Sequence, residues 1–114
     1  MAHQNLLDLL DESMLARGIS MEHSSNVAWR PDDAIEVISS IKDSSWAILG
    51  GDVLVHDGEG YRSTYDNWYT EPEQGEKHAE YLTRSYSASV RYIQDYMKNN
   101  SGDFVFVLVG GRVL

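Results

Sequence analysis

Apolar residues recur every three or four positions along three stretches of the chain, which predicts three helices. The first is expected over Asn5–Arg17, where Gly18 provides a natural stop. The second is expected to begin at Pro31 and to end near Lys42, and the third to run over Gly75–Asn100. The residues expected on the buried sides of these helices are Leu6, Leu7, Leu10 and Met14, then Ala34, Ile35, Ile38 and Ile41, and finally Ala79, Leu82, Tyr86, Val90, Ile93 and Met97.

Two other stretches have the pattern of strands that are covered on both faces. Trp46–His56 carries apolar residues on either face, and Phe104–Val109 is an unbroken apolar run that Gly110-Gly111 is expected to end. Gly50-Gly51 interrupts the first run, which indicates a β-bulge or a close approach of another backbone. Regular alternation would place Trp46, Ile48, Leu54 and His56 on one face and Ala47, Leu49, Val53 and Val55 on the other.

A turn signal at Asp57–Gly60 follows the first strand and predicts a hairpin. The return strand is expected to be short, over Tyr61–Tyr65, with a loop over Asp66–Pro72. The polar stretch Ile19–Ala28 is also expected to be a loop, with a short extended piece at Val27–Arg30.

These elements, in the order α-α-β-β-α-β, predict a single α+β domain over residues 1–114. A hairpin followed by a helical crossover predicts a sheet of about three strands. We expect the C-terminal strand to run parallel to the return strand and to lie beside the first strand of the hairpin.

The charge of the chain is negative and concentrated. The net charge is −9, and the segment Asp43–Glu80 contains nine acidic residues against two basic ones. Such a surface repels nucleic acid and attracts a basic partner. The chain has neither a secretory signal nor an apolar run of the ~20 residues that a membrane span needs, so we expect a cytoplasmic protein that does not enter membranes.

Nothing in the sequence predicts a catalytic residue, a cofactor or a metal site. The chain has no cysteine, and Glu76, His78 and Glu80 do not share a helix face. Asp52 and His56 do share a strand face, and they suggest a small enzyme or a ligand-binding domain as an alternative. No nucleophile lies near them in the sequence, so we expect a protein that is not an enzyme.

The segment Asp57–Glu73 is dense in both aromatic and acidic residues. Tyr and Trp dominate interface hot spots, and acidic residues steer a basic partner. We therefore predict a partner-binding surface formed by Asp57, Glu59, Tyr65, Asp66, Trp68, Tyr69, Glu71 and Glu73. For Trp68 the competing interpretation is a core position. A further alternative is a homodimeric scaffold, in which a second copy covers the apolar C-terminal strand.

Trp46, the step Gly50-Gly51-Asp52 and the pair Asn67-Trp68 together resemble the immunity protein 40 family of bacterial polymorphic-toxin and contact-dependent inhibition systems. The resemblance implies an antidote that binds the toxic C-terminal domain of a partner effector and blocks its active site. Toxins of this kind are often nucleases with basic surfaces, which an acidic antidote would meet quickly. The expected partner is therefore a cognate toxin domain.

Overall fold

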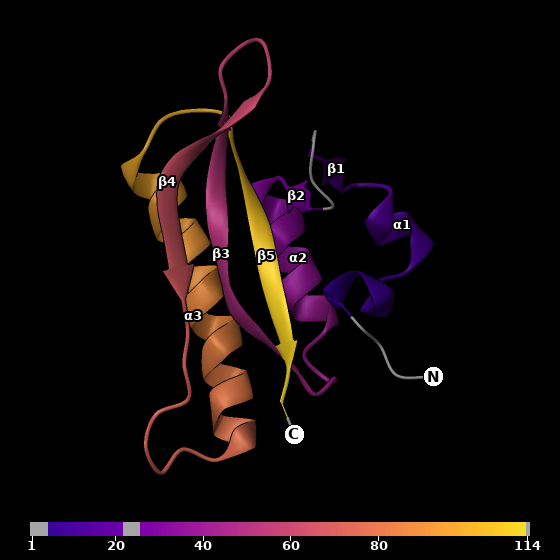
Figure 1. Cartoon of the computed structure of the whole chain (residues 1–114), viewed down its shortest axis with the longest axis vertical. Coiled ribbons are helices and arrows are strands. Elements are labelled where there is room, and N and C mark those ends of the chain that lie inside the picture. Colours follow the sequence, from indigo (N-terminus) through magenta and orange to yellow (C-terminus); the bar gives the residue numbers. More distant parts are fainter. Residues whose placement is uncertain (1–4, 22–25, 114) are drawn as a thin grey trace.

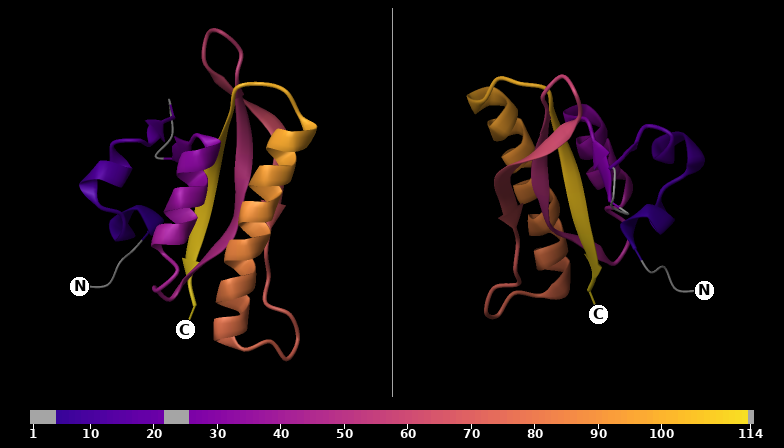
Figure 2. Two further views of the ribbon diagram at one scale, coloured as in Figure 1. Left: turned by 180° about the vertical axis from the view of Figure 1, so that it is seen from behind. Right: turned by 45° about the horizontal axis from the view of Figure 1, so that its top comes forward.

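The computed structural model describes residues 5–21 and 26–113 of the chain. An antiparallel sheet with the strand order β1-β2-β5-β3-β4 forms its centre. Two helices, α2 and α3, lie behind this sheet in Figure 1 and in front of it in the left view of Figure 2, so both cover the same face. The strands are β1 (Ile19–Ser20), β2 (Val27–Trp29), β3 (Trp46–His56), β4 (Tyr61–Tyr69) and β5 (Phe104–Arg112).

The expectation of about three strands is wrong, because the sheet has five. Strand β1 comes from the stretch expected to be a loop, and β2 confirms the short extended piece expected at Val27–Arg30. Because both strands precede α2, the predicted element order α-α-β-β-α-β is also wrong. Strand β2 forms because β3 occupies only one edge of β5, and at the other edge Ala28 pairs with Val107 and Trp29 with Phe106. Strand β1 then pairs with β2. The expected relationship of the other three strands is confirmed, since β5 lies beside β3 and antiparallel to it, as β4 does on the other side.

Two strands are longer than their side chains suggest. Strand β4 ends at Tyr69 instead of Tyr65, because Tyr69 still pairs with Gly50 of β3. Strand β5 ends at Arg112, so Gly110-Gly111 does not stop it. Pairing with β3 continues in both cases through backbone groups, which the polarity of a side chain does not affect.

The predicted first helix is two short helices. The backbone is extended at Leu10, and Asp11 begins a new turn by accepting a hydrogen bond from the N–H of Met14 at 2.8 Å. The second helix begins at Pro31 as expected. The third begins at His78, which leaves Ala79 exposed in its first turn instead of buried. The helices are η1 (Leu6–Leu9, a 3-10 helix), α1 (Glu12–Leu15), α2 (Pro31–Ser40) and α3 (His78–Asn99).

A β-bulge at Leu49 reverses the alternation of side chains along β3. Ile48 pairs with Gly110 of β5 and Gly50 pairs with Val109, so Leu49 is the extra residue. As a result Ile48 and Val53 both lie in the core under the helices, whereas Leu54 packs on the opposite face. The prediction that Ile48 and Leu54 share a face is wrong, because one inserted residue moves all later side chains to the other side. A bulge is confirmed directly before Gly50-Gly51, and Gly50 also shows the close backbone approach given as the alternative, since a Cβ there would lie 2.1 Å from the Trp68 carbonyl oxygen.

Strand β5 is covered on both faces over most of its length, as expected. Phe106 and Leu108 face the helices, and Val105 and Val107 on the opposite face are also buried. Val109 differs, because 44% of it is exposed. Up to Leu108, the chain itself therefore buries both faces of β5. A second copy is not needed to cover this part of the strand.

Candidate partner-binding surface

The edge strand β4 presents two tyrosines to solvent. Tyr65 is 89% exposed and Tyr69 is 75% exposed. A tyrosine ring in water is unfavourable for a single folded chain, whereas at an interface it supplies a large contact area with little loss of side-chain entropy. Both tyrosines belong to the predicted surface, and β4 holds them on a paired strand and not on a loop.

The backbone at Tyr65 is in the left-handed region, with φ of 66°. Asp52 pairs with Asn67 and Leu54 with Ser63, so β4 has extra residues opposite Val53. The Thr64 hydroxyl supports this irregularity by donating to the carbonyl of Val53 at 2.9 Å. A non-glycine residue in this conformation costs about 1–2 kcal/mol, and such strain concentrates at functional sites. The same irregularity makes β4 a poor edge for pairing with a further strand.

Trp68 lies against α3 and not in solvent. Its ring stacks on that of Tyr92 with 4.6 Å between centroids, and its indole N–H donates to the Ser89 hydroxyl at 3.0 Å. Gly51 permits this position, since a Cβ there would lie 2.4 Å from the indole ring. The structure thus shows the core position for Trp68, while its role as a binding anchor stays a prediction.

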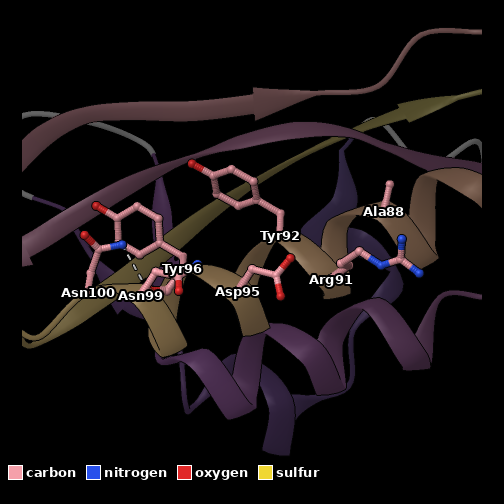
Figure 3. Close-up of a pocket in the computed structure, with 7 residues that line it drawn as sticks. All are labelled: Ala88, Arg91, Tyr92, Asp95, Tyr96, Asn99 and Asn100. Carbon is pink, nitrogen blue, oxygen red and sulfur yellow. Dashed lines mark hydrogen bonds between the residues drawn. The ribbon is translucent and has the colours of Figure 1, made fainter.

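A shallow depression of about 440 Å³ runs along the exposed side of α3 (Figure 3). Tyr92 and Tyr96 line it together with Asp95 and Arg91. The Tyr96 hydroxyl donates to the Asp66 carboxylate at 2.8 Å, and burial together with this carboxylate raises the pKa of Tyr96. Asp66, a predicted site residue, is therefore held between β4 and α3 with a fixed direction.

Asp57 and Glu59 lie in the turn between β3 and β4, at the top of Figure 1. The Asp57 carboxylate accepts hydrogen bonds from the N–H groups of Glu59 and Gly60, at 3.0 and 3.1 Å. These hydrogen bonds, followed by the charge of Arg62, hold the pKa of Asp57 below its usual value. Asp57 shapes the turn and keeps its negative charge, and Glu59 is exposed beside it.

Glu71 and Glu73 lie beyond the other end of β4, at the bottom of Figure 1. Arg84 of α3 holds this loop by donating to the Glu71 carbonyl and by a bidentate pair with Glu76 at 2.8 and 2.9 Å. Hydrogen bonds from Arg84 lower the pKa of Glu76 from 4.5 to about 2. Glu73 is 3.9 Å from Arg84 and remains largely exposed.

The predicted site residues therefore follow one edge of the molecule instead of forming one cluster. A nine-residue strand spans roughly 30 Å, so the acids of the hairpin turn are far from those of the loop after β4. The two exposed tyrosines and Asp66 lie between these two acidic ends.

Asp52 and His56, the alternative site, do not meet in one pocket. Asp52 and Glu59 line a depression of about 780 Å³ on the open face of the sheet, and His56 is not among its lining residues. The His56 ring packs edge-on against Tyr61, and its Nδ1 accepts a hydrogen bond from the N–H of Gly58 at 3.1 Å. In the described part of the chain, no three His, Asp or Glu side chains are grouped as metal ligands would be.

Sequence reasoning missed two exposed apolar residues, Leu49 and Val109. Both were expected to be covered, and both belong to the five large hydrophobic side chains that are exposed in residues 5–21 and 26–113. The signal that could have found Leu49 is Gly50-Gly51, because a bulge there reverses the faces of the strand.

In the described residues, no helix combines the length and the apolar character that crossing a membrane requires. No curated protein matches the sequence significantly. The model of the family described as Immunity protein 40 matches residues 13–110, which is most of the chain and includes every strand pairing described above except those at the last residues of β5. The chain therefore belongs to the immunity protein 40 family.

Proposed function

We propose that this immunity protein neutralises its cognate toxin by binding it along β4 and the two acidic turns that flank this strand. The observation that carries the proposal is the exposure of Tyr65 and Tyr69 on the edge strand β4, between two groups of carboxylates. Aromatic anchors of this kind provide the energy of an interface, and the surrounding charges select the partner.

The charge supports a basic toxin domain as the partner. The exposed acids Asp57, Glu59, Glu71 and Glu73 extend along the same edge as the tyrosines. Complementary charge raises the rate of association and suppresses wrong partners. A nuclease fits this requirement, because the surface with which it holds nucleic acid is positive. An antidote on that surface would cover the active site.

The irregularity at Tyr65 determines how β4 contacts the toxin. An uninterrupted edge strand could add a strand of the toxin to the sheet, but β4 departs from regular pairing between Ser63 and Asn67. Side chains, and not backbone pairing, therefore make the interface. No covalent bond is made or broken in this mechanism, since the protein acts by occupying the surface of the toxin.

The test is binding of the toxin domain encoded next to this protein. We expect Tyr65→Ala and Tyr69→Ala together to lower the affinity about tenfold or more, because each removes an aromatic anchor. Leu15→Ala is the matched control, since Leu15 is also exposed but lies on α1, away from β4. Wild-type affinity in the double variant would refute this surface, and failure of the wild-type protein to protect cells that express the toxin would refute the function.

A further inference from the structure

A concave region lies on the face of the sheet that α2 and α3 leave open. It is the depression of about 780 Å³ that Asp52 and Glu59 line. Ser20 of β1 and Gly60 of the hairpin turn also line it, so it extends from one edge strand to the turn between β3 and β4. Pockets that hold ligands have volumes of about 300–1,000 Å³. The depression is therefore large enough to receive side chains of another molecule.

Part of the lining is apolar. Val107 lines the depression and forms a small buried cluster with Ala28 and Val105. Leu54 and Tyr61 line it as well, pack against this cluster and stay partly exposed. The depression thus offers apolar surface on which another molecule can bury the aliphatic part of a side chain.

The charged part of the lining is negative. Asp52 and Glu59 are both exposed, and no lysine or arginine is among the described residues that line the depression. Neither carboxylate has a hydrogen bond or an ion pair with any residue in 5–21 or 26–113. Arg62, the basic residue of β4, lies 3.8 Å from Asp57 instead. The described chain therefore leaves both carboxylates without a positively charged partner.

We propose that this depression receives a basic loop of the toxin. The inference rests on the proposed function and adds a second contact region to the same interface. Stems of lysine or arginine side chains would lie on Leu54, Tyr61 and Val107, and their charged ends would pair with Asp52 and Glu59. Long basic side chains bury their stems on apolar surface while the charge stays at its edge. Hydrogen bonds between a cation and a carboxylate are about twice as strong as those between neutral groups.

Continuity and charge favour the toxin over a second copy of this chain as the occupant. Glu59 belongs both to the depression and to the proposed toxin surface. Asn67 pairs with Asp52 and lies two residues before Tyr69, so the side chains of Asp52 and Tyr69 leave the sheet on the same face. A second copy also carries a net charge of −9, so two such depressions would bring like charges together. One basic partner can cover β4 and the depression at the same time.

The first test removes the charge of Asp52, which lies outside the surface proposed along β4. Titration calorimetry measures the affinity of full-length variants for the toxin domain. We expect Asp52→Asn to weaken binding about tenfold, as for the loss of a charge-assisted hydrogen bond. The loss should shrink at high salt, because salt screens the attraction in the wild type. Asp43→Asn removes the same charge from an exposed position outside the sheet and should bind like the wild type.

The second test adds a positive charge to the depression. Ser20 is exposed and lines it from β1. We expect Ser20→Lys to weaken binding by more than about tenfold, because the new side chain occupies the depression and repels a basic loop. Ser87→Lys is the matched control. It adds the same charge at an exposed position on α3, outside the depression, and should bind nearly like the wild type.

The outcomes separate this inference from the proposed function. If Tyr65→Ala weakens binding while Asp52→Asn and Ser20→Lys do not, the β4 surface stands and the depression is not part of the interface. If the wild-type protein binds no toxin, both proposals fail. Equal losses in Ser20→Lys and Ser87→Lys would show an effect of net charge alone and overturn the inference.

Two further measurements complete the test. A wild-type dimer in sedimentation that Ser20→Lys dissociates would overturn the inference in favour of a second copy. Asp52 and Ser20 are both exposed, so both variants should unfold in urea at the wild-type midpoint. If one of them is destabilised, the affinity of the other decides.

Discussion

The backbone N–H of Ile48 donates a hydrogen bond to the hydroxyl oxygen of Ser85 on α3, at 3.1 Å. The carbonyl of Ile48 accepts from the Thr70 hydroxyl at 2.7 Å. Both bonds are buried, and they lie where β3 leaves its regular pairing with β5 at Leu49. The bulge that leaves Leu49 exposed is thus held from the opposite side of the sheet, by α3 and by Thr70, the residue that follows β4.

Replacing Ser85 by alanine tests this support. We expect Ser85→Ala to lower the free energy of unfolding by about 1–3 kcal/mol, because the N–H of Ile48 would remain buried without an acceptor. Ser87→Ala is the control, since Ser87 is exposed on the same helix and bonds only the carbonyl of Arg84. Urea unfolding measures both variants, and equal midpoints would contradict the role assigned to Ser85.

Gly50 should tolerate no side chain. We expect Gly50→Ala to lower the free energy of unfolding by more than about 2 kcal/mol, because the new Cβ meets the Trp68 carbonyl in a backbone conformation that already disfavours it. Gly60→Ala should change stability by less than about 0.5 kcal/mol, since nothing lies within 4 Å of a Cβ there. Thermal or urea unfolding measures the stability of both variants. A Gly50→Ala protein as stable as the wild type would disprove the geometry of the bulge.

Trp68 and Tyr69 are neighbours in the sequence, but replacing each by alanine should have opposite effects on stability and on toxin binding. Trp68→Ala removes a ring packed on Tyr92 and should cost roughly 3 kcal/mol of stability. Tyr69→Ala should change stability by less than about 0.5 kcal/mol and weaken binding of the toxin. Unfolding curves and binding titrations on both variants separate the two effects. A stable Trp68→Ala protein that fails to bind would instead make Trp68 an anchor.

The Glu76–Arg84 pair should make stability depend on pH at acidic values. The pKa of Glu76 is lowered in the folded protein, so its ionised form stabilises the fold. This contribution is complete above pH 4.5 and is lost as the pH falls toward 2. The stability difference between the wild type and Glu76→Gln should therefore be larger at pH 6 than near pH 2, as measured by urea unfolding. If the stability difference between the two proteins stays constant with pH, the ion pair between Glu76 and Arg84 does not stabilise the fold.

Glu71→Gln provides the control for that experiment. It removes one negative charge from the same loop and leaves the bidentate pair of Arg84 with Glu76 intact. Its pH profile therefore reports the effect of net charge alone.

Short-range signals in the sequence predicted those helices and strands whose ends depend on neighbouring residues. Pro31 begins α2 because its ring suits the first helical turn, and the bounds of β3 follow from an apolar run between polar neighbours. The position of β5 beside β3 follows from connection rules and from its apolar character. Gly50-Gly51 also indicates the bulge at Leu49, but regular alternation along β3 does not predict the reversal of faces that this bulge causes.

The sequence by itself determined the acidic charge, the position of the hairpin and the aromatic segment of β4. Only the tertiary structure decided which of these aromatic side chains are available to a partner. Trp68 and Tyr69 differ by one position, yet Trp68 faces Ser89 and Tyr92 of α3, while Tyr69 projects from the open face. The reason is pairing register, because a strand places successive side chains on opposite faces and contacts with a distant helix select which of them is buried.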